Sequence, residues 1–205
     1  MKVKTLFLIC FLSITCLLNA ADKPVIQIHT DNSSLIFRIA DNGRLYQSYL
    51  GKKLSHETDI SHLPHGTEAY ITHGMEDYFE PAIHILHNDG NPSLLLKYVS
   101  HETKAVSQGV NETIITLGDD KYPVTVKLHY VTYPAEDIIK TYTEISHKEK
   151  KPVVLHQYAS SMLHLNRAKY YLTEFAGDWA HEANISDQPL EFCLLYTSPS
   201  PRDTR

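Results

Sequence analysis

Apolar and polar side chains alternate with a period of two along most of the chain. In the stretch "YPVTVKLHYVTY", residues 122–133, every second position is apolar, as in Val124, Val126, Leu128 and Tyr130. Successive side chains of a β-strand point to opposite faces, so these four share one face and the polar residues between them share the other. The pattern predicts a strand with one buried face and one solvated face.

The same alternation recurs at intervals of roughly ten to fifteen residues. Stretches of this kind cover residues 25–30, 34–40, 44–54, 82–88, 93–106, 111–119, 137–148 and 151–163. Turn-forming sequences separate them, such as "DNG" at 41–43, and an Asn-Gly pair between two apolar runs is a strong hairpin signal. No amphipathic helix of useful length lies between these stretches. The predicted fold class is all-β, a large antiparallel β-sandwich.

Residues 55–81 break the alternation. Their sequence, "SHETDISHLPHGTEAYITHGMEDYFEP", predicts one long irregular loop. A long loop on a rigid sheet scaffold often carries function, because binding groups are commonly placed on connections. We therefore expect residues of functional interest in this segment.

The two ends of the chain differ from the part between them. Residues 1–20 begin with positively charged side chains, continue with an apolar run and end at small residues that suit a cleavage site. This arrangement predicts a secretory signal and a periplasmic or secreted protein. Residues 193–205, "CLLYTSPSPRDTR", resemble the translated read-through of a sequencing adapter, and the alternative is a natural flexible Pro/Ser tail. The expected sandwich domain is 21–192, with the natural protein continuing beyond it.

Composition limits the partners of the domain 21–192. All three cysteines lie in the two ends, so the domain must be stabilised by its apolar core without disulfides. Its 23 acidic side chains exceed its 15 basic ones. This balance argues against a nucleic acid or an anionic membrane as a partner and is compatible with a neutral substrate such as a sugar.

Histidines and acids supply the candidate chemistry. Histidines crowd between residues 62 and 87, but none of their spacings matches a helical HExxH or paired CxxC pattern. His84 and His87 are expected to point to opposite faces of a strand. We predict no metal and no cofactor. No GxSxG elbow for a hydrolytic serine is present.

Paired carboxylates could serve sugar chemistry if they faced each other across a pocket. Asp77 with Glu80, or Glu174 with Asp178, are the pairs that could be proposed. The sequence does not place either pair face to face. The residues alone therefore predict an exported β-sandwich whose function stays open.

An ordered series of motifs adds a resemblance to a known family. "GRLYQSYLGKKL", "EDYFEPAIHI", "LLLKYVSHE", "YPVTVKLHYVTYPAEDIIKTYTEISHKEKKPVVL" and "YYLTEFAGDWAHE" followed by "QPLEF" resemble the N-terminal domain of bacterial α-galactosidases of glycoside hydrolase family 36, of Bacteroides-like style. The resemblance covers essentially all of 25–192. It implies a β-sandwich followed by a catalytic (β/α)₈ barrel with two aspartates for retaining hydrolysis of terminal α-linked galactose. Both aspartates would lie beyond residue 192, so no catalytic residue is expected here.

The resemblance also implies substrate-binding residues. Asp77 corresponds to an Asp of the family stretch "EYPxYGxxDFRxPA", although Phe79–Glu80 departs from that pattern, and Tyr170 lies near another residue at the edge of the sugar site. The competing interpretation makes Asp77 a turn anchor and Tyr170 a core residue. Some family members are tetramers, so the full-length enzyme could be a homo-oligomer. The alternative function is a non-catalytic carbohydrate-binding or assembly module.

Overall fold

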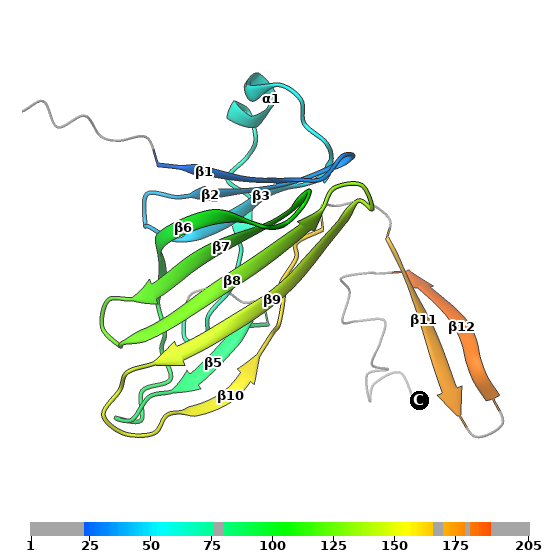
Figure 1. Cartoon of the computed structure of the whole chain (residues 1–205). Helices are drawn as coiled ribbons and strands as arrows, with labels where there is room; N and C mark the ends of the chain where they lie inside the picture. The colour runs from blue at the N-terminus through cyan, green and yellow to red at the C-terminus, as the bar shows by residue number, and fades with distance from the viewer. Residues whose placement is uncertain (1–22, 76–79, 166–169, 179–180, 190–205) are drawn as a thin grey trace, which may run out of the picture.

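The computed structural model describes residues 23–75, 80–165, 170–178 and 181–189, and these contain twelve strands and one short helix (Figure 1). In chain order the elements are β1 Val25–His29, β2 Ser33–Ile39, β3 Leu45–Lys52, α1 Glu57–Ser61, β4 Thr67–Glu68, β5 Ile83–Leu86, β6 Leu96–Ser107, β7 Val110–Asp119, β8 Val124–Tyr133, β9 Ile138–His147, β10 Val154–Tyr158, β11 Tyr171–Asp178 and β12 His181–Pro189.

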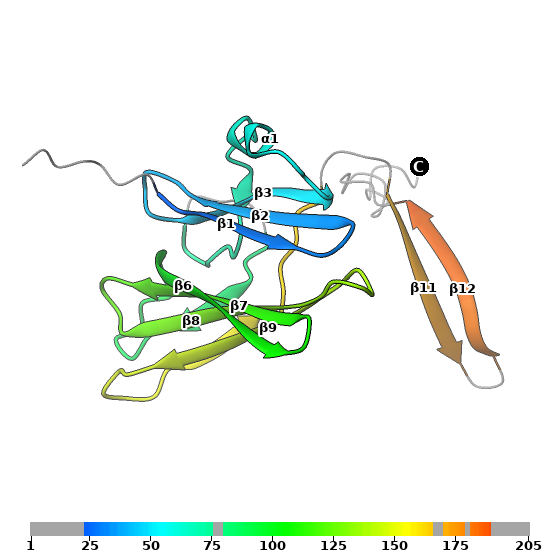
Figure 2. The same cartoon turned by 45° about the horizontal axis from the view of Figure 1, so that its top comes forward.

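Two antiparallel sheets form the body of the domain. One has the strand order β1-β2-β3-β4, and the other has the order β6-β7-β8-β9. They lie one above the other as two layers (Figure 2). Two further antiparallel pairs are β10 with β5 and β11 with β12. The all-β, antiparallel sandwich predicted from the sequence is confirmed.

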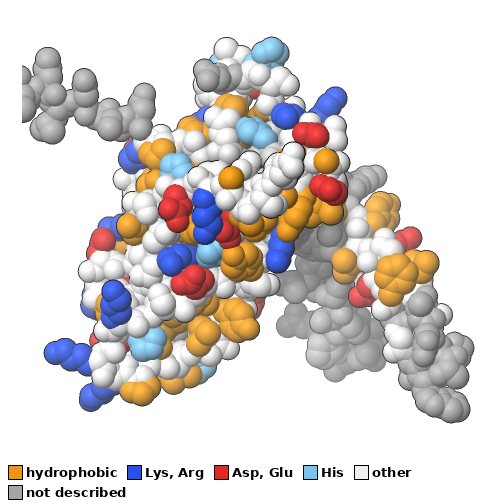
Figure 3. All heavy atoms as spheres, in the orientation of Figure 1, with side chains coloured by type: hydrophobic (Ala, Val, Ile, Leu, Met, Phe, Trp, Pro, Cys, Tyr) orange, Lys and Arg blue, Asp and Glu red, His pale blue; other side chains and the backbone are white. Residues whose placement is uncertain are grey.

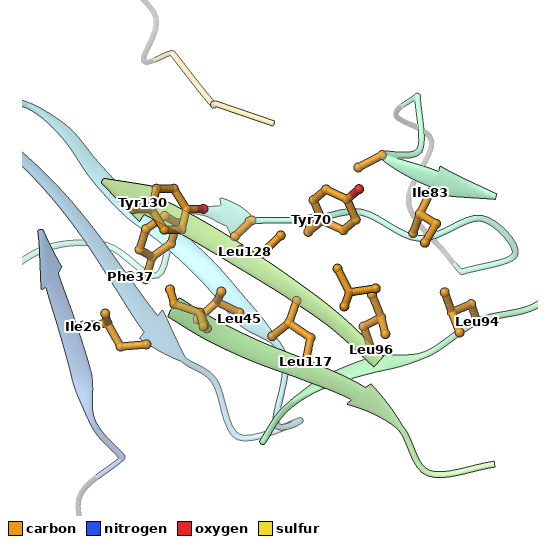
Figure 4. Close-up of a cluster of buried hydrophobic side chains, with 14 of the residues drawn as sticks. Ile26, Phe37, Leu45, Tyr70, Ile83, Leu94, Leu96, Leu117, Leu128 and Tyr130 are labelled. Carbon is orange, nitrogen blue, oxygen red and sulfur yellow. The ribbon is translucent and has the colours of Figure 1, made fainter. Parts of the chain in front are cut away.

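The core lies between the two layers and uses the positions that the alternation selected. Val126 and Leu128 of β8 face inward and are almost fully buried. Phe37 of β2 and Tyr130 of β8 meet across the layers with ring centroids 5.2 Å apart. Apolar side chains from both sheets fill the space between them (Figure 4). The burial of one face of each strand explains why the period of two is visible in the sequence.

Residues 55–75 and 80–81, the described part of 55–81, are more ordered than the sequence predicted. The segment contains α1 and β4, and β4 pairs with β3. Residues 69–72 then enter the core, where Tyr70 is 2% exposed and donates its hydroxyl hydrogen bond to the carbonyl of Ala159 at 2.7 Å. The backbone N–H groups of His73 and Ala82 bond to Ile83 and Ile71 respectively. The segment therefore joins β3 to β5.

The hairpin of β11 and β12 stands apart from the two layers (Figures 1 and 2). Tyr171, Phe175 and Ile185 of the hairpin are each about two thirds exposed, at 65%, 67% and 67%. The hairpin thus adds no side chains from these positions to the core.

The described residues include no helix that is both long and apolar enough to cross a lipid bilayer.

Candidate functional site

Of the two residues expected at the edge of a sugar site, the structure describes only Tyr170. Asp77 lies in 76–79, outside the described residues. Tyr170 is half-buried and immediately precedes β11. Their role in substrate binding stays a prediction.

Described residues that precede and follow 76–79 in the sequence contact β5 and β10. His73 stacks on His84 of β5, with ring centroids 3.7 Å apart. Glu80 accepts a hydrogen bond from the side-chain amide of Gln157, on β10, at 2.9 Å.

Three imidazoles form a cluster at the same place. His84 lies between His73 and His156, whose ring centroid is 4.8 Å away. His156 is the extra residue of a β-bulge, since Leu155 pairs with Ile85 and Gln157 with His84. A bulge re-aims a side chain, which here brings His156 toward His84. Burial lowers the pKa of His84, and the two neighbouring imidazoles lower it further.

This cluster does not form a metal centre. Ring nitrogens bind a metal through lone pairs in the ring plane, and the stacked rings of His73 and His84, 20° apart in plane, do not bring those lone pairs to one point. Among the described residues, no group of three or more His, Cys, Asp or Glu side chains could hold a metal ion.

His87 has a different environment from His84, in agreement with the expectation that the two point to opposite faces. Its side chain is fully buried, its Nδ1 lies 2.7 Å from Oε1 of Glu149, and its ring stacks on Tyr122 at 3.6 Å. Burial raises the pKa of Glu149, but hydrogen bonds from His87 and from the Asn88 backbone N–H outweigh it and leave that pKa below its usual value. The pair joins the loops after β5 and β9 and is structural.

A polar network on the outward face of the β6–β9 sheet was missed by the sequence analysis. Its centre is Glu112 of β7, whose Oε1 accepts from the Tyr142 hydroxyl at 2.5 Å and from Nδ1–H of His129 at 2.9 Å. Nζ of Lys104 lies 2.9 Å from Oε2. Hydrogen bonds from Tyr142, Lys104 and His129, in that order of effect, lower the pKa of Glu112 to about 2. Glu112 is therefore a carboxylate at neutral pH.

The network joins all four strands of the sheet. Lys104 comes from β6, Glu112 from β7, His129 from β8 and Tyr142 from β9. The sequence signal was the run of polar residues that alternates with the core positions of β7 and β8. That signal shows a polar face, but cross-strand partners follow only from the register, which pairs Ile114 with His129 and His129 with Tyr142.

A second polar link attaches the segment after β10 to the other sheet. The side-chain amide of Gln47 donates to the carbonyl of His164 at 2.7 Å, and its oxygen accepts from the His164 backbone N–H at 3.1 Å. Nε2 of His164 bonds to the carbonyl of Glu68 at 2.7 Å. Glu68 in turn accepts from Nε of Arg44 at 2.9 Å. These hydrogen bonds hold the chain at His164 against β3 and β4, six residues before Tyr170.

Comparison with known proteins places this domain in a family. A family model described as the glycosyl hydrolase family 36 N-terminal domain matches residues 42–195, well over half of the chain. Among curated proteins none matches it.

Solved structures with a similar fold are α-galactosidases. One from Lactobacillus brevis shares 20% identity with a TM-score of 0.71. A family 36 α-galactosidase variant from Geobacillus stearothermophilus, in complex with raffinose, shares 19% with a TM-score of 0.74. Another variant from that organism, in complex with stachyose, shares 18% with a TM-score of 0.73. Each match covers 82% of this chain and 28% of the other, so this chain spans less than a third of their length.

At such low identity the structural likeness shows the fold alone. The family match is stronger evidence of family membership, because it extends over β3 to β12 and includes strands from both layers of the sandwich. The chain therefore belongs to the family of glycosyl hydrolase family 36 N-terminal domains.

Proposed function

We propose that the chain is the N-terminal β-sandwich of an exported, retaining α-galactosidase that hydrolyses terminal α-linked galactose from oligosaccharides. The family match over residues 42–195 carries this proposal. The α-galactosidases of similar fold support it, since two of them are complexes with raffinose and stachyose. Export rests on the pattern of residues 1–20.

The domain contributes structure to this enzyme and the chemistry lies elsewhere. Retaining hydrolysis needs two carboxyl groups about 5–5.5 Å apart, one of them in an environment that keeps it protonated. The described acids that were considered for this role are exposed: Glu80 accepts a hydrogen bond from Gln157 and Glu174 accepts one from Gln188. We therefore place both catalytic carboxylates on polypeptide that follows this domain.

Within the enzyme, we assign Asp77 and Tyr170 to the edge of the sugar site. A carboxylate accepts hydrogen bonds from sugar hydroxyls, and a phenol ring packs against the apolar face of a sugar. Asp77 lies between His73 and Glu80, which contact β5 and β10. The competing role for Asp77 is a turn anchor that bonds to backbone N–H groups of its own loop.

Two measurements on the longer protein test this function. The genomic reading frame beyond codon 192 should encode a barrel with two suitably placed aspartates, and a stop codon there contradicts the proposal. In that protein, Asp77→Ala should raise the Michaelis constant for raffinose and leave the melting temperature unchanged. Asp59→Ala, an exposed position of α1 in the same segment, is the matched control. A lowered melting temperature with an unchanged Michaelis constant would assign Asp77 to the turn.

A further inference from the structure

The outward face of the β6–β9 sheet presents an aromatic ring in a fixed position. Tyr142 starts on β9, and its hydroxyl reaches Glu112 on β7, so the side chain crosses β8. The phenol ring stacks on the imidazole of His129 with centroids 4.3 Å apart and an interplanar angle of 13°. We call this ring, with His129 and Glu112 behind it, the Tyr142 platform.

The platform is held in place and is partly exposed to solvent. His129 is 7% exposed because Tyr142 covers it, whereas Tyr142 is 39% exposed. Nζ of Lys140 lies over the Tyr142 ring, 5.8 Å from its centroid, so a ligand on this ring packs beside that ammonium group. A ring that is already fixed by a hydrogen bond and a stack loses little conformational entropy when a ligand packs on it.

The charged side chains around the platform balance. Lys104, Lys127 and Lys140 share this face with Glu102, Glu112 and Glu144, as the strand register shows. Figure 3 shows basic and acidic side chains intermixed with apolar ones over these strands. Lys127 and Glu144 form an exposed pair at 3.2 Å. Equal numbers of the two signs give no net attraction for an anion or a cation, which favours a neutral polar ligand.

One polar atom of the platform lacks a hydrogen bond within the described part of the chain. Nε2 of His129 is buried, and the nearest carboxylate oxygen, Oε2 of Glu144, is 3.6 Å away. That separation is too long for a direct hydrogen bond. Buried polar atoms are rarely left without a partner. Nε2 itself is closed to solvent, so a ligand hydroxyl would meet this site at the Glu144 carboxylate beside it, whose side chain is 52% exposed.

We propose that the Tyr142 platform binds a neutral oligosaccharide. The ring takes the apolar C–H face of one sugar residue, as aromatic side chains do. Glu144 and Lys127 supply an acceptor and a donor for sugar hydroxyls at the edge of the ring, and both are partly exposed. The sugar is taken to be an α-galactoside, a choice that rests on the proposed function.

Saturation-transfer NMR with the 205-residue chain and raffinose tests the proposal. Raffinose protons should receive saturation from the protein, and Tyr142→Ala should weaken binding about threefold to tenfold, the loss of one aromatic contact. Tyr158→Ala is the matched control, since Tyr158 is an exposed tyrosine, 63% exposed, on β10. It should leave raffinose binding unchanged.

Two further variants keep the test valid if Tyr142→Ala does not fold. Tyr142→Phe retains the ring and loses only the hydroxyl bond to Glu112, so it should keep most of the binding. Glu144→Gln should weaken binding without unfolding the sheet, because the Glu144 side chain is 52% exposed.

Three results would contradict binding at the Tyr142 platform. Absence of saturation transfer to raffinose, equal losses for Tyr142→Ala and Tyr158→Ala, or preferential binding of inorganic phosphate would each overturn the platform. Hydrolysis by the longer protein is measured separately. Hydrolysis with no raffinose binding here rejects the platform alone, whereas binding here with no hydrolysis there rejects the enzyme assignment.

Discussion

At the scale of single residues, Gly66 and Gly90 have the same backbone conformation but differ in the space available for a side chain. Gly66 has a φ of +82°, and a Cβ added to it would lie 1.9 Å from the carbonyl oxygen of Gln47. Gly90 has the same φ of +82°, but a Cβ there would meet nothing within 4 Å. Both positions favour glycine because L-residues rarely adopt positive φ. Only Gly66 adds a collision with the backbone of β3.

This pair gives a prediction for stability. Gly66→Ala should lower the free energy of unfolding by about 3 kcal/mol or more, because β3 and the segment before β4 must move apart. Gly90→Ala should cost only about 1 kcal/mol, which is the cost of holding an L-residue at positive φ. Urea denaturation of both variants measures the difference. Equal losses would show that the close approach at Gly66 is relieved at no cost.

The histidine cluster gives a prediction for pH. The pKa of His84 is lowered below its ordinary value of 6.5, so the unfolded chain takes up a proton at a higher pH than the folded chain. The contribution of His84 to stability is therefore complete above pH 6.5 and is lost as the pH falls below it. Denaturation midpoints between about pH 7.5 and about pH 5.5 should decline less in His84→Asn than in the parent chain.

The control for this experiment is His147→Asn, an exposed position at the end of β9. It removes one imidazole outside the cluster and so gives the reference against which the effect of His84→Asn is compared. If His84→Asn and the parent lose stability equally on acidification, His84 does not take up its proton as the cluster geometry requires.

At the scale of elements, the β11–β12 hairpin differs from every strand of the two layers. Phe175 pairs directly with Ile185, and both side chains are 67% exposed. An isolated two-stranded hairpin is marginally stable in water, because it buries little apolar surface. The strands of the β6–β9 sheet gain that stability from the core beneath them.

Hydrogen exchange measures this contrast. In the 205-residue chain, backbone amides of β11 and β12 should exchange at least about a hundredfold faster than those at the centre of β7 and β8. The physical reason is that opening the hairpin exposes almost no additional apolar surface. Protection of Phe175 and Ile185 equal to that of Ile115 and Leu128 would mean that the hairpin is packed in solution.

The elements also show which features a sequence can predict. β8 is predicted because Val124, Val126 and Leu128 are buried on one face and alternate with polar residues. Residues 69–72 are just as buried, yet their run is too short to show a period, and their place depends on bonds to β3 and β5 from opposite sides. Burial of one face produces a readable pattern, whereas long-range pairing does not.

The same limit applies to the candidate sites. Tyr142 and His129 each occupy the polar side of a recognisable strand, but their stacking is fixed by the β8–β9 register and not by either strand alone. The His73–His84–His156 cluster requires a β-bulge in β10, for which the sequence gives no signal. The expected role of Asp77 came from family resemblance, and residue 77 lies outside the described part of the structure.

At the scale of the whole molecule, a sandwich with its own core is joined to a hairpin that makes little use of that core. The two layers bury their apolar side chains against each other (Figure 4). The domain matches a family whose solved α-galactosidases are more than three times as long as the matched region. A folded unit of this kind fits the proposed function, in which the catalytic residues lie on another part of a longer chain.

The most direct test of that organisation is hydrolysis of an aryl α-galactoside by two purified proteins. One is the 205-residue chain, and the other is the protein encoded by the genomic reading frame extended beyond codon 192. We expect the extended protein to release the aryl group and the 205-residue chain to show no turnover, because the paired carboxylates of retaining hydrolysis are assigned to the extension. Turnover by the 205-residue chain that survives removal of contaminating galactosidase, or an inactive but folded extended protein, would contradict this account.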